Sequence, residues 1–94
     1  MFPRILARLR ACIRERRYVA TLHAEEEIAN DNWSIFDVER AILTGEIIER
    51  QRDKATGEWK YLVRGQALNG ADAVVVAKLS PTGKLVILTV FLGE

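Results

Sequence analysis

The sequence has very little of the chemistry that marks metal proteins and disulfide-stabilised domains. Its 94 residues include one cysteine, Cys12, and one histidine, His23. A single cysteine excludes an internal disulfide and a thiolate cluster for zinc. We therefore predict no metal and no cofactor. One free thiol is typical of a reducing compartment, so we expect a cytoplasmic protein.

Long apolar segments are missing as well. The longest stretch lies within residues 85–92 and is interrupted by Thr89. It is far shorter than the roughly 20 residues that a membrane helix needs, so we expect no membrane contact. No separate apolar region follows the arginine-rich start, which argues against a secretory signal. A glycine-rich phosphate loop and a nucleophile elbow are also absent, which argues against those enzyme classes.

Charge is nearly balanced overall but unevenly distributed along the chain. Residues 1–20 hold six Arg and one Glu, a balance of +5, and residues 21–49 hold eight acids and one Arg, a balance of −7. Residues 50–94 carry a balance of +3. Such asymmetry is typical of a nucleic-acid or partner-binding face, and equally of a basic helix that lies against acidic helices.

Apolar spacing predicts helices in the first half of the chain. One helical stripe comprises Ile5, Leu6, Leu9, Cys12 and Ile13, and the arginines Arg4, Arg8, Arg10, Arg14 and Arg17 fall outside it and are expected to face solvent or a partner. Tyr18 to Ala20 breaks this pattern, Thr21 is a good N-cap, and Gly45 is a natural C-cap. Ser34 and Asp37 form a capping-box signal. We predict helices at about 3–17, 22–31 and 35–44.

From Glu46 onward the apolar period changes to two, which is typical of strands. We predict strands at about 46–52, 58–66, 72–79 and 84–92, joined by short turns. The predicted fold is α+β, with two to three N-terminal helices packed on a four-stranded antiparallel β-meander in a single domain, residues 1–94. Apolar residues on both faces of the last two strands predict that these are central or covered in an oligomer, which leaves a homodimer open.

His23 is the one candidate acid/base residue. It stands near the start of a predicted helix beside Glu25, Glu26 and Glu27. These carboxylates suit the positive end of the helix dipole. The imidazole could act as a general acid or base, or hold a structural hydrogen bond. With Glu27 it makes an i, i+4 pair, which is too few ligands for a metal site.

Four basic residues on two neighbouring predicted strands form a second candidate site. They are Arg50, Arg52, Lys60 and Arg64. Pairing of the two strands would bring them together on one face, while Trp59 and Tyr61 would point into the core. Such a cationic face holds phosphates without reading sequence. An ordinary solvated sheet face explains the same pattern.

Several short segments, in this order and spacing, resemble a known bacterial family. They are Thr21 to Ala24, Ser34 to Val38, Ile42 to Glu49, Tyr61 to Val63, Val74 to Val76 and Leu88 to Phe91. The family is called domain of unknown function 4258, and the resemblance extends over roughly residues 5–92. It implies a fold similar to the RelE-like and BrnT-like toxins of type II toxin–antitoxin systems, many of which cleave RNA without a metal.

On this resemblance the candidate residues acquire roles. His23 would be the catalytic acid/base group, the four basic residues would bind RNA phosphates, and a cognate antitoxin would be the partner. The sequence departs from the family pattern at Glu27, where an arginine is common, and at Phe91, where a tyrosine is frequent. Both changes remove groups that would serve ribonuclease chemistry. The alternative is a non-enzymatic protein-interaction module or inactive toxin relative, binding through the first helix or a sheet edge.

Overall fold

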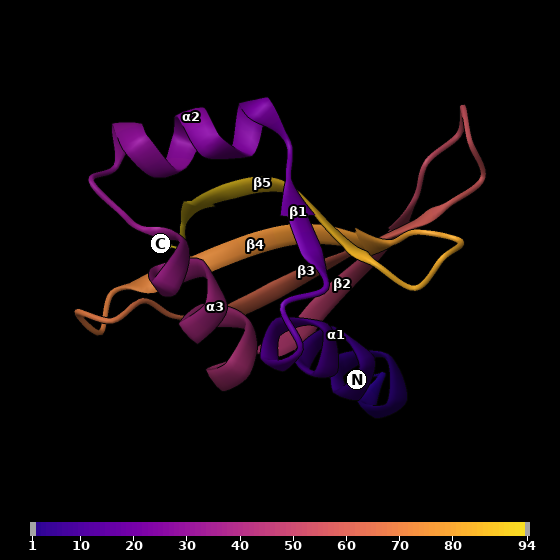
Figure 1. Cartoon of the computed structure of the whole chain (residues 1–94), viewed down its shortest axis with the longest axis horizontal. Coiled ribbons are helices and arrows are strands. Elements are labelled where there is room, and N and C mark those ends of the chain that lie inside the picture. Colours follow the sequence, from indigo (N-terminus) through magenta and orange to yellow (C-terminus); the bar gives the residue numbers. More distant parts are fainter. Residues whose placement is uncertain (1, 94) are drawn as a thin grey trace.

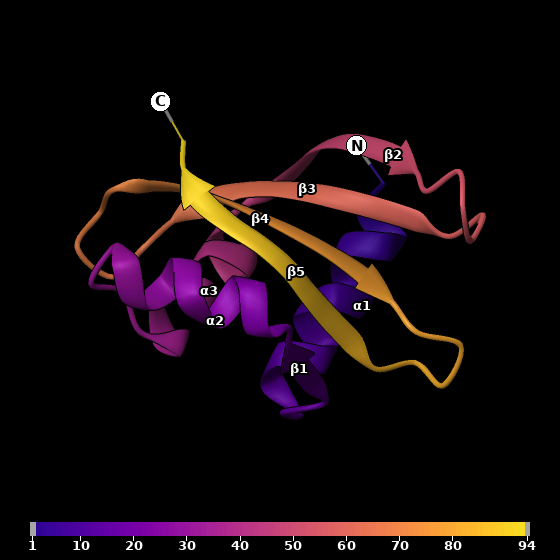
Figure 2. The same cartoon turned by 90° about the horizontal axis from the view of Figure 1, so that it is seen from above.

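The computed structural model describes residues 2–93. These residues form α1 (Pro3–Arg14), β1 (Tyr18–Ala20), α2 (Leu22–Asn30), α3 (Ile35–Thr44), β2 (Glu46–Arg52), β3 (Trp59–Gln66), β4 (Asp72–Leu79) and β5 (Leu85–Leu92) (Figure 1). The predicted α+β class is confirmed. The helices lie together on one side of a twisted sheet, and the opposite face of the sheet carries no helix (Figure 2).

The sheet has five strands in the order β1-β5-β4-β3-β2. Strands β2 to β5 are antiparallel neighbours, but β1 runs parallel to β5, with Tyr18 opposite Leu85 and Ala20 opposite Ile87. The prediction of a four-stranded, wholly antiparallel meander is therefore wrong. Three residues are too few to show a period of two, which is why the sequence pattern misses β1. The interior places of β4 and β5 agree with their apolar sequences.

Two helices end in Schellman motifs, which turn the chain sharply. In the first, Arg16 has a φ of 56° and the Arg17 N–H donates to the Cys12 carbonyl at 2.9 Å. This motif stops α1 at Arg14, before residue 17, and releases the chain into β1. The second motif follows α2, where Asn32 has a φ of 57°. Asparagine tolerates this left-handed conformation better than arginine does.

The core lies between the helices and the covered face of the sheet. Its fully buried members include Leu9 of α1, Ile42 of α3, Val63 of β3, Val75 of β4 and Ile87 of β5. Helices α1 and α3 and strands β3, β4 and β5 therefore contribute to one apolar core. Arg10, expected on an exposed surface, instead donates to the Gly45 carbonyl at 2.8 Å and thereby ties α1 to the end of α3.

A β-bulge in β2 decides which way its arginines point. Ile47 lies opposite Val63 and Glu49 lies opposite Leu62, so Ile48 is the extra residue. Directly opposite residues of paired strands share a face of the sheet. After the bulge, alternation is shifted by one residue relative to a regular strand. The second half of β2 therefore carries its odd-numbered side chains on the open face and its even-numbered ones on the helical face.

A second bulge lies in β5, where Leu88 is the extra residue. Beyond it, β1 no longer covers the edge of β5, and α2 takes over that role. The Thr21 hydroxyl donates to the Leu88 carbonyl at 3.2 Å. The Glu27 carboxylate accepts from the Val90 N–H at 3.0 Å. These two bonds satisfy backbone groups that would otherwise have no partner at the sheet edge.

Candidate functional site

The β2 bulge gathers two arginines around one tryptophan. Arg50 lies opposite Tyr61 and Arg52 lies opposite Trp59, on the helical side of the sheet. The Cζ atom of Arg50 is 4.0 Å from the centroid of the Trp59 ring, and that of Arg52 is 5.1 Å away. Arg50 also lies 4.7 Å from the ring centroid of Phe2. These distances fall within the cation–π range, so stacking on aromatic rings holds the guanidinium groups.

A cavity of about 250 Å³ adjoins this stack. Its walls are Ile5, Arg8, Glu58, Trp59, Tyr61, Leu79, Ser80 and Pro81. Arg8 is exposed on α1 and brings a third guanidinium to the surface that contains Trp59. We call Arg8, Arg50, Arg52 and Trp59 the arginine–tryptophan cluster. Its arginines come from two elements that are far apart in the sequence.

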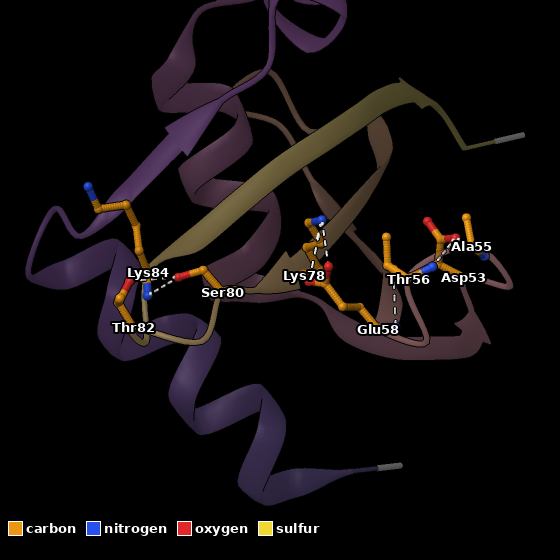
Figure 3. A network of polar contacts seen from close by, with 8 residues as sticks. All are labelled: Asp53, Ala55, Thr56, Glu58, Lys78, Ser80, Thr82 and Lys84. Carbon is orange, nitrogen blue, oxygen red and sulfur yellow. Dashed lines mark hydrogen bonds and ion pairs between the residues drawn. The ribbon is translucent and has the colours of Figure 1, made fainter.

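Carboxylates near the cluster are already engaged. Glu58 lines the cavity, but its carboxylate pairs with the Lys78 ammonium at 3.4 Å (Figure 3). Asp53 accepts from the N–H groups of Ala55 and Thr56, and the first of these bonds is the larger cause of the lowered pKa of Asp53. No ion pair among residues 2–93 involves the three arginines of the cluster. Their positive charge is therefore available to a ligand.

Lys60 and Arg64 lie on the other, open face of the sheet. They alternate with Tyr61 and Val63, which are buried under the helices. Arg64 is also committed to the protein, since its Nη2 atom is 3.1 Å from an Asp72 carboxylate oxygen and 3.1 Å from the Gly93 carbonyl oxygen. The prediction that all four basic residues share one face is therefore wrong, because the bulge turns the β2 pair to the opposite side.

His23 is exposed and forms one end of a short chain of polar contacts. Its Nε2 atom is 3.3 Å from Oε1 of Glu27, and that same oxygen accepts the Val90 N–H. The side chain of Glu27 is 24% exposed, whereas that of His23 is 66% exposed. The strand therefore holds the carboxylate, and one ring nitrogen of His23 lies within ion-pair distance of it.

The histidine and the arginine–tryptophan cluster do not meet. Residue His23 lies beside β5, whereas Arg50 and Arg52 lie on β2, and β4 and β3 separate these strands. Three strand spacings correspond to about 14 Å. The predicted catalytic residue and the predicted phosphate-binding residues are thus spread over both edges and both faces of the sheet.

Comparison with protein families now places the chain. A family model described as Domain of unknown function (DUF4258) matches residues 20–92. The chain belongs to this family. The matched region contains α2, α3 and strands β2 to β5, and it leaves α1 outside. Arg8 is therefore contributed by a part of the chain that the DUF4258 model does not include.

A curated relative of this DUF4258 chain gives a partial match. It is the mRNA-capping enzyme subunit alpha of Eremothecium gossypii, 39% identical over 57 residues. The matched stretch is 60% of this chain but 12% of that protein. No solved structure matches the chain significantly.

Two further features concern the part of this DUF4258 domain that the structure describes, one its metal-ligating side chains and the other the length of its helices. Within residues 2–93, no group of three or more His, Cys, Asp or Glu side chains is arranged to hold a metal ion. Among the same residues, no helix is long and apolar enough to cross a membrane.

The sequence analysis missed three contributors to these sites. The helical pattern predicts only that Arg8 faces solvent or a partner, and strand alternation predicts Trp59 as core, although Trp59 is 36% exposed. Glu27 was weighed as a dipole-matched surface residue, yet it holds both Val90 and His23. The i, i+4 spacing of Glu27 and His23 was the only signal in the sequence for this contact.

Proposed function

We propose that this DUF4258 domain interacts with RNA, and that the arginine–tryptophan cluster holds the RNA backbone. The observation that carries the proposal is the stacking of Arg50 and Arg52 on Trp59, with Arg8 across the adjoining cavity and no paired carboxylate. Stacked guanidinium groups present planar, bidentate donors that suit phosphate oxygens.

The number of arginines sets the expected strength and salt dependence. Single-stranded RNA releases about 0.7 counterions per neutralised phosphate, so three contacts predict a slope of about −2 in a plot of log affinity against log salt. Affinity would be modest and would vary little with sequence, because phosphate contacts position a strand without reading bases. Selectivity among RNA sequences would then have to come from contacts outside the cluster.

A metal-independent ribonuclease of the toxin–antitoxin type is the narrower form of the proposal. The contact between His23 and Glu27 favours it, because an imidazole beside a carboxylate can serve as acid or base without a metal. Lys60 would then guide the strand over the open face, whereas Arg64 is already paired with Asp72. The distance between the histidine and the cluster supports binding more than cleavage. The partial likeness to the capping-enzyme subunit adds no argument, since it concerns 12% of that protein.

Fluorescence anisotropy with a labelled, single-stranded oligouridylate tests the proposal. We expect the double variant R50Q/R52Q to lose most of the affinity of the unaltered chain. The matched control is R14Q/R40Q, which removes the same charge at two exposed positions outside the cluster. Equal losses in the two variants, or no binding by the unaltered chain, would overturn the assignment of the RNA surface to the cluster.

A further inference from the structure

Strand β1 forms an edge of the sheet and has unused backbone groups. The flanking residues Arg17 and Thr21 each hydrogen-bond to β5 at 3.0 Å, through a carbonyl and an N–H respectively. Alternate residues of a strand direct their backbone groups to opposite sides. The N–H and C=O groups of Tyr18 and Ala20 therefore point away from β5, and β1 is the last strand on that side among residues 2–93.

A cavity of about 470 Å³ opens beside this edge. Its walls are Tyr18, Val19, Ala20, Glu25, Ile28 and Ile35, contributed by β1, α2 and α3. All three residues of β1 line it, although successive side chains of a strand point to opposite faces. The cavity must therefore face the edge of the strand. Its volume lies within the roughly 300–1,000 Å³ of ordinary binding pockets.

Two carboxylates lie at the cavity, and one guanidinium, that of Arg16, is near enough to act on the Tyr18 phenol. Glu25 is part of its wall, and the Tyr18 hydroxyl donates to the carboxylate of Glu39. The pKa of Tyr18 is raised to about 12, mainly by burial and next by this hydrogen bond, so the phenol remains a neutral donor. Helix α2 holds three glutamates and no basic residue, and α3 holds two acids and one arginine, so the two helices together have a balance of −4. A phosphate would be repelled here, whereas a lysine or arginine would be attracted.

We propose that the β1 edge and this cavity bind an extended segment of a basic partner protein. The segment adds a strand beside Tyr18 and Ala20, places an aliphatic side chain against Ile28 and Ile35, and sets a lysine or arginine next to Glu25. Addition of a strand to an exposed sheet edge is a common mode of peptide recognition. The site is separate from the arginine–tryptophan cluster and does not depend on RNA binding.

Charge also argues against a second copy of this chain as the occupant. Pairing of two β1 edges would bring two acidic cavities together, and like charges at an interface are costly. The basic segment of the chain itself, α1, is folded as a helix whose apolar residues Leu9, Cys12 and Ile13 are buried in the core. It cannot serve as an extended segment without unfolding.

Calorimetric titration of the full chain with a synthetic peptide tests the proposal. The probe is an acetylated and amidated heptapeptide that alternates lysine with valine and leucine, and its control replaces each lysine with glutamate. We expect the basic peptide to bind and the acidic one not to bind. Glu25→Lys should weaken binding about three- to tenfold, since it replaces an attractive charge with a repulsive one. The matched control is Glu26→Lys, an exposed neighbour that does not line the cavity.

Amide hydrogen exchange locates the peptide. Slower exchange at Tyr18 and Ala20 on addition of the basic peptide would support strand addition, because free edge N–H groups then gain partners. The proposal is overturned by equal binding of both peptides, by equal losses in the two variants, or by protection confined to other elements. A concentration-dependent dimer that protects Tyr18 and Ala20 without peptide would also overturn it, because the edge would then belong to a second copy.

Discussion

Gly65 of β3 lies directly against the backbone of Ala41 in α3. A β-carbon added at Gly65 would be 1.9 Å from the Ala41 carbonyl oxygen, and one added at Gly45 would be 2.5 Å from the same atom. Real β-carbons essentially never come so close to other atoms, and a backbone atom cannot turn aside as a side chain can. Glycine at these two positions therefore allows α3 to pack closely on the sheet.

The first prediction concerns this contact. Gly65→Ala should destabilise the fold by about 3 kcal/mol, because helix and strand must separate to admit a methyl group. The free energy of unfolding is measured by urea titration followed by circular dichroism. The control is Gly93→Ala. Gly93 lies near the end of the chain, and the added atom would be 3.3 Å from a side-chain atom of Val74. A loss of similar size in both variants would contradict this explanation.

Much of the fold follows from local patterns in the sequence. The helical stripe from Ile5 to Ile13 and the switch to alternation after Gly45 predict the α+β class. The Thr21 cap forms as expected, since its hydroxyl accepts the Ala24 N–H at 3.1 Å. These features depend on neighbouring residues, which is why a single sequence is enough to identify them.

The site was harder to predict because it depends on register. One extra residue, Ile48, turns Arg50 and Arg52 from the open face to the helical face. Nothing in the composition of β2 marks a bulge, since the residue is neither glycine nor flanked by turn residues. The proximity of Arg8 to Trp59 similarly results from the packing of α1 on the sheet. Contacts between segments that are far apart in the sequence produce no repeating apolar pattern, so the sequence does not reveal them.

The second prediction concerns Glu27 as an edge cap. Glu27→Ala should reduce stability by about 1–2 kcal/mol, because the Val90 N–H loses its acceptor at a partly buried edge. Glu27→Gln retains an oxygen acceptor and should lose less. Urea titrations give the stabilities, and hydrogen exchange of the Val90 amide should accelerate in the alanine variant. Exposed Glu26 is the control, and a loss from Glu26→Ala as large as that from Glu27→Ala would refute the capping role.

The third prediction is a pH dependence that originates at Asp37. Its carboxylate accepts the Ser34 N–H at 2.8 Å and the Leu68 N–H at 2.9 Å, joining the start of α3 to the β3–β4 loop. The hydrogen bond from the Ser34 N–H is the largest cause of a lowered Asp37 pKa, which lies below the usual 3.8. This stabilisation is therefore present above pH 3.8 and is lost as pH falls through the lower folded-state pKa.

Asp37→Asn tests this dependence. At neutral pH the variant should be less stable by about 1 kcal/mol, the usual contribution of a helix cap. The difference between the two proteins should shrink as the pH falls below 3.8 and disappear below the lower folded-state pKa, where the aspartate is neutral in both states. Urea titrations at a series of pH values measure it. A difference that does not change with pH would assign the effect to packing instead of charge.

The fourth prediction separates the charge of the cluster from its geometry. R50K/R52K keeps both positive charges but replaces planar, stacked groups with flexible ammonium groups. We expect weaker binding of oligouridylate with an unchanged slope of about −2 against salt, because the number of neutralised phosphates is retained. R50Q/R52Q should reduce the slope to about −0.7, which leaves one contact from Arg8. Identical affinity of the lysine variant and the unaltered chain would show that stacking on Trp59 contributes nothing.

The fifth prediction separates binding from chemistry at opposite edges of the sheet. His23→Ala should leave the affinity for oligouridylate unchanged, because the imidazole lies beside β5, which is three strand spacings, about 14 Å, from the arginine strand β2. If His23 acts as acid or base, the same variant should lose about 10²–10⁴-fold in the rate of RNA cleavage measured in EDTA. R50Q/R52Q should show the reverse pattern, with weak binding and residual cleavage at saturating RNA. Equal background cleavage by the unaltered chain and His23→Ala would remove the catalytic role and leave an RNA-binding domain. A loss of affinity in His23→Ala would instead show that the RNA reaches across the sheet to α2.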